Sequence, residues 1–130
     1  MTQKLFEPKK RTALAARFEA QKIAFAPVVF QCAVQLIRSG LLQSIHNAGT
    51  QGLSIDDAAL HTNLSRYACA ILMETALSAD ILVMNNERYQ IGDVGYFLLK
   101  DDMTRVNIDF IEDVCYRPLS HLGASLHESR

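Results

Sequence analysis

Two side chains that can hydrogen-bond a polar substrate flank a proline near the end of the sequence. Tyr116 and His121 lie on either side of Pro118, which kinks or splits a helix because proline has no amide hydrogen to donate. A phenol and an imidazole can each donate and accept hydrogen bonds, so the two side chains could make polar contacts at this bend. The alternative is a structural role, which is the commoner fate of a single tyrosine or histidine near a helix kink.

Carboxylates occur in two adjacent pairs, Asp56-Asp57 and Asp101-Asp102. Acidic residues at the start of a helix are stabilised by the helix dipole, which is the simplest interpretation of both pairs. Metal binding or acid–base catalysis would need further converging groups. The sequence has no CxxC or HExxH motif and no zinc-finger spacing, and its four histidines do not cluster. We therefore expect no catalytic centre, metal site or bound cofactor in this chain.

The cysteines and the apolar segments indicate in which cellular compartment the protein resides. Cys32, Cys69 and Cys115 are far apart, odd in number and set in apolar patterns, which predicts buried, reduced thiols in a cytosolic protein. No apolar run is long enough to cross a bilayer. Charged residues such as Arg17 and Glu19 interrupt the apolar core that a signal peptide needs. We expect a cytoplasmic protein without a membrane partner.

Positive charge is concentrated at the N-terminus. The 130 residues have a formal net charge of -1. Residues 1–22 contain six basic and two acidic residues, a net charge of +4, whereas the other 108 residues have a net charge of -5. The run Lys9-Lys10-Arg11 is interpreted as part of a solvated arm, and contact with nucleic-acid or membrane anions is the alternative.

Apolar periodicity and capping residues predict helices through the first part of the chain. Thr12 is a candidate N-cap for a first helix, and Pro27 fits the first turn of a second helix over residues 27–38. Gly40 suits the left-handed position that follows a helix. A short helix is expected over residues 41–47.

Two further helices and a hairpin are predicted next. Ser54 and Ser65 are candidate N-caps, and Leu53 is expected to form a strand of one or two residues. The segments ILVM and YQI around NNER predict a β-hairpin. Asn85-Asn86 can adopt the positive φ angles of its turn.

The order of these elements predicts a fold class. After the hairpin, GDVGYFLLKDD predicts a short helix, and residues 104–127 predict a longer one that Pro118 interrupts. We predict a mainly α protein, specifically a winged helix-turn-helix with a small β-hairpin wing and flanking N- and C-terminal helices. The hydrophobic content of 49% is sufficient for a real core.

The helix predicted over residues 65–79 lacks the charges of a DNA-reading helix. Recognition helices use cations for phosphates and long polar side chains for base edges. This helix has only Arg66 at its start, and Glu74 would repel phosphate. The hairpin adds only Arg88, next to Glu87. We expect no nucleic-acid partner. The remaining positions are apolar nearly all round, which predicts a helix that is buried on most sides, either by the flanking N- and C-terminal helices or by another domain or subunit.

The layout resembles the N-terminal domain of class I S-adenosylmethionine-dependent methyltransferases of the O-methyltransferase type. The resemblance covers most of the chain and consists of apolar patterns in a particular order. The matching segments are KKRTALAARFEAQKIAFAPVVFQCAVQL, RSGLLQSI, LSIDDAALHTNLSRYACAILMETALSADIL and YQIGDVGYFLL. In that family a helical, winged-helix-like dimerisation domain precedes a Rossmann-like catalytic domain.

The resemblance implies a division of the chain and a set of functional residues. Residues 1–26 would form an N-terminal arm and dimerisation helix, residues 27–100 a winged-helix domain, and residues 101–130 helices leading to a catalytic domain. Tyr116 and His121 would then adjoin the catalytic domain as a substrate wall. Four apolar residues would lie in a homodimer interface, with packing inside the monomer as the alternative: Phe18, Phe25, Val29 and Phe30.

One feature of the family is missing from this sequence. The family binds its cofactor at a glycine-rich turn, whereas Gly92 and Gly95 do not form a GxGxxG motif and follow a strand of the hairpin. We therefore interpret the chain as an N-terminal fragment that is not catalytic on its own, with S-adenosylmethionine implied for the catalytic domain. The alternatives are a dimeric winged-helix transcriptional regulator that binds DNA and a free-standing protein-interaction module.

Overall fold

The computed structural model describes residues 10–128, so part of the predicted arm, including Lys9, lies outside the described residues. Helices make up most of the described chain, and two strands form one antiparallel sheet. The elements are α1 (Ala13–Ala24), α2 (Ala26–Arg38), α3 (Leu41–Ala48), the 3₁₀ turn η2 (Gly49–Gln51), α4 (Ile55–His61), α5 (Arg66–Ser78), β1 (Leu82–Asn85), β2 (Arg88–Ile91), α6 (Asp93–Lys100), α7 (Asp102–Phe110), the π-helix η3 (Ile111–Cys115), the 3₁₀ turn η4 (Pro118–His121) and α8 (Leu122–Glu128). The prediction of a mainly α protein with a small hairpin is confirmed.

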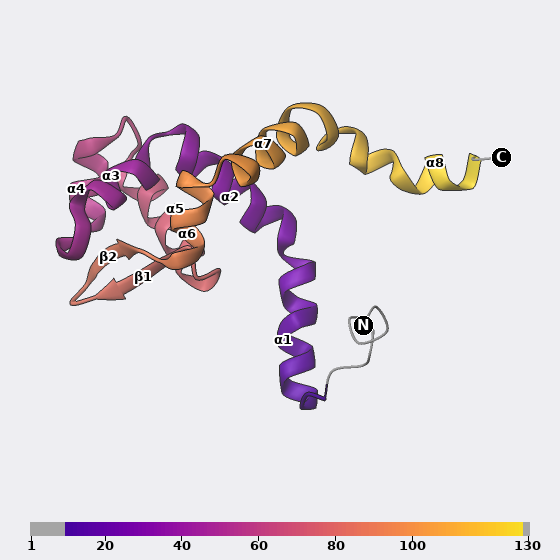
Figure 1. Cartoon of the computed structure of the whole chain (residues 1–130), viewed down its shortest axis with the longest axis horizontal. Coiled ribbons are helices and arrows are strands. Elements are labelled where there is room, and N and C mark those ends of the chain that lie inside the picture. Colours follow the sequence, from indigo (N-terminus) through magenta and orange to yellow (C-terminus); the bar gives the residue numbers. More distant parts are fainter. Residues whose placement is uncertain (1–9, 129–130) are drawn as a thin grey trace.

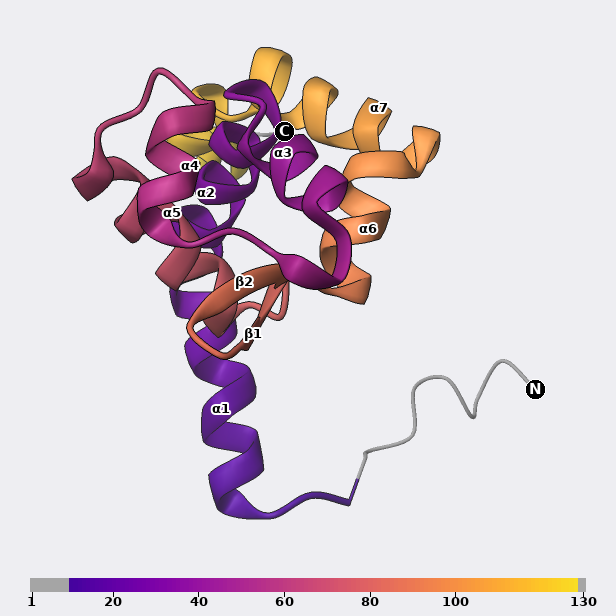
Figure 2. The ribbon, with the colours of Figure 1, turned by 90° about the vertical axis from the view of Figure 1, so that its left-hand side faces the viewer.

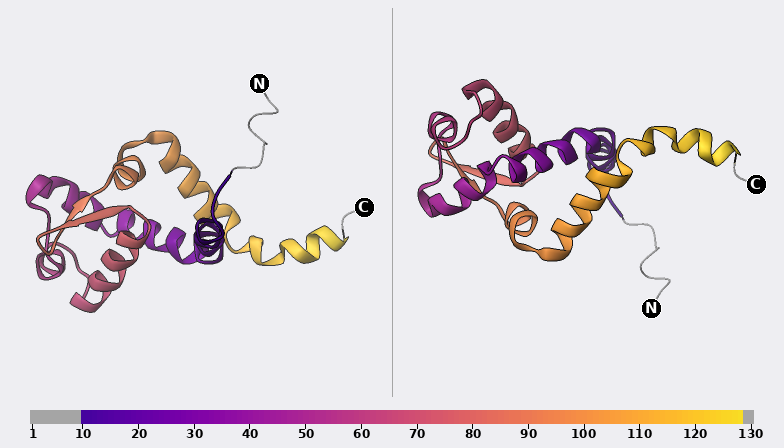
Figure 3. Two further views of the ribbon diagram at one scale, coloured as in Figure 1. Left: turned by 90° about the horizontal axis from the view of Figure 1, so that it is seen from below. Right: turned by 90° about the horizontal axis from the view of Figure 1, so that it is seen from above.

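The molecule consists of a body and two projecting helices. Helices α2 to α6 gather around the hairpin, whereas α1 and α8 extend away from them in different directions (Figure 1). Neither α1 nor α8 contains a buried residue. Viewed along α1, this helix lies between the body and the C-terminal segment that ends in α8 (Figure 3). The two projecting helices therefore present most of their side chains to solvent.

A bend separates α1 from α2. The two helices are inclined by 59°, and Phe25 lies between them as the C-cap of α1 and the N-cap of α2. Pro27 occupies the first turn of α2, as predicted, where its missing amide hydrogen has no intrahelical partner to lose. Within the described residues, no single helix is long and apolar enough to cross a bilayer, and α1 and α2 reach that length only as this bent pair.

The core lies where α2, α3 and α5 meet the hairpin. Several large side chains there have no exposed surface: Leu36, Leu41, Leu42, Ile45 and Met73. Figure 2 shows the hairpin below α3 and α4, with α6 to one side. Helices α2 and α3 form strongly amphipathic patterns in which apolar residues recur at helical spacing, so each buries one face here.

Short polar side chains define the starts of the helices, as predicted. The hydroxyl oxygens of Thr12, Ser54 and Ser65 accept hydrogen bonds from backbone amides one turn later, at 3.1, 3.1 and 3.0 Å. Asp57 completes a capping box because its carboxylate accepts from the Ser54 amide at 3.4 Å. Gly40 has a φ of 82°, so its predicted left-handed conformation is also confirmed.

The hairpin turn is shifted by one residue from its predicted position. Asn86 and Glu87 have φ angles of 53° and 62°, whereas Asn85 is the last residue of β1 and pairs with Arg88. The prediction of a positive φ angle in the turn is therefore confirmed for Asn86 and was wrong for Asn85. The predicted short strand at Leu53 exists as an isolated bridge, which anchors the hairpin to the body.

Helix α5 is less buried than predicted. It buries Cys69, Met73 and Ala76, but 75% of Tyr67 and 47% of Ile71 remain exposed. Helices α2 and α4 and strand β1 contact α5 from its core side. Within the described residues no element covers the outer face of α5, so the alternative that the N- and C-terminal helices cover it was wrong, and contact of this face with another domain or subunit stays a prediction.

The C-terminal region confirms the predicted break at Pro118. Residue 118 begins η4, which separates the π-helix from α8. Ile108 is the buried residue of α7. The apolar stripe predicted for this region is largely exposed, with exposures of 65% for Val106, 55% for Phe110 and 67% for Leu126.

Replacing Met73 with alanine tests the packing of α5. Met73 has no exposed surface, so Met73→Ala should lower the free energy of unfolding by about 2–5 kcal/mol. Ile71→Ala on the exposed face of the same helix should cost less than about 1 kcal/mol. Urea unfolding measures both values, and equal losses would contradict the orientation of α5.

Removing the Asp57 carboxylate should produce a pH-dependent loss of stability. The Ser54 amide, the Ser54 hydroxyl and Arg88 hold the pKa of Asp57 below its ordinary value of 3.8. A carboxylate with a lowered pKa stabilises the fold above its unfolded pKa, and this contribution is lost as the pH falls through the folded pKa. Asp57→Asn should therefore be less stable than the wild type at pH 7, and the difference should shrink below about pH 4.

Urea unfolding between about pH 3 and pH 7 measures this difference. Asp56→Asn is the matched control, because Asp56 lies in the same helical turn and is not the carboxylate of the capping box. A difference for Asp57→Asn that stays constant down to the lowest pH would contradict the role of its carboxylate.

Candidate functional site

An apolar groove of about 920 Å³ lies between the α1–α2 bend and the body. One wall comes from α1 and α2, and includes Phe18 and Phe25. The opposite wall comes from residues 78–81 at the end of α5 and just after it, together with α6 and α7, and includes Leu98 and Ile108. Because apolar side chains dominate both walls, the groove suits an apolar surface better than a charged ligand.

All four predicted interface residues line this groove: Phe18, Phe25, Val29 and Phe30. Phe18 is 62% exposed and Phe25 is 57% exposed, so neither packs into the core of the isolated chain. Val29 and Phe30 are half-buried. The place of these four residues in a dimer interface stays a prediction. The opposite wall was not predicted, because it combines segments far apart in the sequence.

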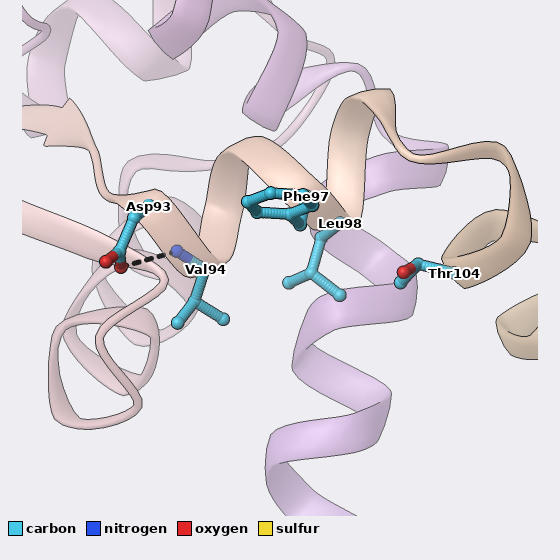
Figure 4. A pocket seen from close by; sticks show the side chains of 5 residues that line it. All are labelled: Asp93, Val94, Phe97, Leu98 and Thr104. Atoms are coloured by element: carbon cyan, nitrogen blue, oxygen red, sulfur yellow. Dashed lines mark hydrogen bonds between the residues drawn. The ribbon is translucent and has the colours of Figure 1, made fainter.

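A smaller hollow of about 350 Å³ adjoins the groove on α6. Figure 4 shows its side chains, with Phe97 and Leu98 on the helix and Thr104 on the neighbouring segment. The hollow and the groove share Val94, Leu98 and Thr104. At its edge the Val94 amide donates a hydrogen bond of 2.7 Å to the Asp93 carboxylate. The two depressions thus form one continuous apolar region.

Tyr116 packs against α2. Its ring stacks on Phe30 with a centroid distance of 5.4 Å and an interplanar angle of 13°. Its hydroxyl donates a hydrogen bond of 3.2 Å to the carbonyl oxygen of Pro27. His121 is exposed on η4, and no hydrogen bond joins it to Tyr116 within the described range. The structure therefore does not bring the two predicted wall residues into one hydrogen-bonded group.

Polar contacts hold α7 and η3 against α2. The Gln31 amide donates to Glu112 at 2.5 Å, and the Arg38 guanidinium donates to Asp113 at 3.0 Å. Asp109 lies 3.5 Å from the same guanidinium. The hydrogen bond to Asp113 is the main cause of a raised Arg38 pKa. Sequence reasoning missed these contacts, which position one wall of the groove.

The cations of α5 and the hairpin are already paired. Arg66 contacts the Asp56 carboxylate at 2.7 Å. Arg88 contacts Asp57 at 2.9 Å and also donates to the carbonyl oxygens of Gln51 and Gly52. These guanidinium groups are engaged with the protein, which disfavours a phosphate-binding role for this face.

The cysteines do not form a reactive cluster. The Cys32 thiol lies 3.3 Å from the Leu72 carbonyl oxygen, and burial raises its pKa to about 11. Cys69 is buried, but Cys115 is only half-buried, so the prediction of three buried thiols was wrong at that position. Within residues 10–128, no group of three or more His, Cys, Asp or Glu side chains could hold a metal ion.

Comparison with known proteins identifies the family. The Dimerisation2-like domain family matches residues 17–89, which include most of α1, the α1–α2 bend and the core. The chain therefore belongs to this family, which confirms the resemblance to the dimerisation domains of O-methyltransferases. A search of curated proteins found no match.

A solved structure has a similar fold. It is the crystal structure of the S-adenosylmethionine-dependent methyltransferase SibL in its apo form, with a TM-score of 0.70 and 21% sequence identity. The match covers 82% of this chain and 31% of the SibL chain. The present chain thus spans about a third of that relative, and the likeness concerns the fold alone.

Proposed function

We propose that this chain is the N-terminal dimerisation and substrate-lid domain of an S-adenosylmethionine-dependent methyltransferase, and that it forms a homodimer. The observation that carries the proposal is the exposure of α1. This helix buries no residue, and its large apolar side chains Leu14, Phe18 and Ile23 are all more than 60% exposed. A helix that exposes several large apolar side chains marks a protein–protein contact. The family match supports the same assignment.

We further propose that helices α3, α4 and α5 with the hairpin form a winged helix-turn-helix that serves as a scaffold. Support comes from the order of these elements and from the hairpin that follows α5 directly. Helix α5 carries a single basic residue, Arg66, which is paired with Asp56. The outer face of this helix therefore offers apolar and acidic groups, not the cations that DNA recognition requires.

In the full-length enzyme, S-adenosylmethionine would bind to a catalytic domain outside this chain. This chain contributes no glycine-rich cofactor turn, so we propose that it does not transfer methyl groups by itself. Residues 101–130 would lead toward the catalytic domain. Tyr116 and His121 would face the acceptor substrate only after that domain packs against this region. A cytoplasmic location is part of the same proposal.

A DNA-binding dimer is the second candidate function, favoured by the exposed cations of the N-terminal segment. Arg11, Arg17 and Lys22 are exposed on or next to α1. Lys22 is partly engaged, because its ammonium lies 3.2 Å from Glu19. In this alternative the α1 face would carry phosphate contacts instead of a subunit contact.

The Phe25→Asp substitution should abolish the dimer. It places a charge in the centre of the proposed interface, where an unpaired buried charge is costly. Light scattering coupled to size-exclusion chromatography should give the mass of two chains for the wild type and of one chain for the variant. Leu60→Asp is the control, because Leu60 is 83% exposed on α4 and does not line the groove. A wild-type monomer, or a variant that remains dimeric, would refute the proposed interface.

An electrophoretic shift assay separates the two candidate functions. At about 50 mM salt, where phosphate contacts are strong, the dimerisation domain should not retard a mixed-sequence DNA duplex. A regulator should retard the duplex and release it as salt increases. Retardation that is lost in Arg17→Glu would favour the DNA-binding alternative.

A further inference from the structure

Residues 109–116, at the end of α7 and through η3, lie along one face of α2. Residue numbers rise along α2 while they fall along this segment, so the two run antiparallel. The paired residues, in order along α2, are Pro27 with Tyr116, Gln31 with Glu112, and Arg38 with Asp113 and Asp109. These contacts, together with the stacking of Tyr116 on Phe30, are named the α2 clasp. They extend over roughly 16 Å of helix.

Helix α7 is anchored to the body without the α2 clasp. Ile108 is buried, and Arg105 donates a hydrogen bond of 3.2 Å to the Leu99 carbonyl oxygen. By contrast, three hydrogen bonds join residues 111–128 to the body within the described part of the chain, and all three belong to the clasp. Neither η4 nor α8 contains a buried residue. The clasp therefore fixes the direction in which the chain continues after α7.

A π turn lies at the boundary between the anchored and the clasped parts. In η3 the Tyr116 amide donates to the Ile111 carbonyl oxygen, five residues earlier, at 2.7 Å. Such turns are rare, and they occur frequently at functional sites. Glu112 and Asp113, two carboxylates of the clasp, lie inside this turn. A change of the backbone here would move every residue that follows while Ile108 stays in the core.

The polar part of the α2 clasp is open to solvent. The Arg38 side chain is 42% exposed and that of Asp113 is 60% exposed. Ion pairs with this exposure contribute little to stability and are screened by salt. Tyr116 is half-buried, so its contact with Phe30 adds a limited apolar component. The clasp can therefore open without disrupting the core.

The groove is coupled to the α2 clasp through two residues. Phe30 lines the groove and also stacks on the Tyr116 ring. Ile111 lines the groove and is the first residue of the π turn. Opening of the clasp would separate Tyr116 from Phe30 and displace the wall at Ile111. The shape of the groove and the direction of the C-terminal segment therefore change together.

We propose that the α2 clasp is releasable, and that the π turn is the hinge about which residues 116–128 turn away from α2 when the clasp opens. The structure shows the closed state. The open state keeps the core and α7, and it frees Gln31, Arg38 and the Tyr116 hydroxyl to bind water. In the methyltransferase proposed above, the same motion would change the orientation of the catalytic domain, and this consequence alone rests on the proposed function.

The distance between two spin labels tests the motion directly. Labels are placed on Glu74→Cys in α5 and Ser125→Cys in α8, both at exposed positions. Cys115→Ser removes the half-buried native thiol, and Cys32 and Cys69 are buried, so the introduced cysteines react. Dilution with unlabelled protein restricts double electron–electron resonance to distances within one chain. This parent protein should give one narrow distance distribution at low salt.

Tyr116→Phe in the parent protein removes one hydrogen bond of the clasp and keeps the ring. It should add a second, broader population of distances. Amides of residues 116–128 should also exchange hydrogen at least about threefold faster, because exchange follows local opening. Tyr96→Phe is the matched control, since Tyr96 is exposed on α6 and its hydroxyl forms no hydrogen bond within residues 10–128.

Arg38→Gln in the parent protein removes both ion pairs of the clasp. It should add the same second population, whereas Arg66→Gln, which breaks the exposed pair with Asp56, should not. Added salt should increase the second population in the parent protein and have a smaller effect in Arg38→Gln, because salt screens exposed charges. Circular dichroism should be the same for all variants.

The outcomes separate this inference from the proposed function. Distances that stay unchanged in Tyr116→Phe and Arg38→Gln would overturn the releasable clasp, as would equal effects of the two control variants. Faster exchange without a change in distance would indicate fraying of the helix and would overturn the hinge. A wild-type monomer would refute the proposed function and leave the clasp, whereas unchanged distances in a dimer would refute the clasp alone.

Discussion

The burial of α2 against α3 and α5 is the interaction on which the rest of the structure depends. Leu36 on α2 has no exposed surface and packs in the same cluster as Leu41 and Met73. From this core, α2 continues to the bend with α1, so it fixes where the exposed helix begins. Its outer side carries Gln31 and Arg38, which hold α7 and η3. One buried helix thereby positions both walls of the groove.

Helix caps and the left-handed glycine could be predicted from the sequence, because they depend only on residues close by in the chain. The caps at Ser54 and Ser65 require partners only three residues away, and Gly40 follows a helix end directly. The hairpin turn could not be placed as well, because asparagine favours positive φ and Glu87 does not. Pairing of Leu82 with Ile91 and the bridge from Leu53 to Tyr89 fix the register instead.

The candidate site was predictable on one wall only. Family resemblance indicated Phe18 and Phe25, which lie within a short apolar segment. The opposite wall depends on contacts between α2 and the region after α7, such as the hydrogen bonds from Arg38 to Asp113 and from Gln31 to Glu112, which join residues 75 and 81 positions apart. Tyr116 illustrates the same limit, because its place near Pro118 did not reveal that its ring stacks on Phe30. Periodicity does not reveal which distant helix a side chain will meet.

The direction of α1 is set by the residues at the bend around Phe25, whereas the chemistry of its surface is set by the residues of α1 itself. The Phe25 amide donates to the Gln21 carbonyl, and the Phe25 carbonyl accepts from Val29, so the backbone hydrogen bonding continues through the corner. Substitutions near Pro27 would therefore change the angle between α1 and α2 as a whole without altering any side chain of α1. Related chains that differ at the bend would therefore associate at different angles and distances while keeping the same exposed apolar helix.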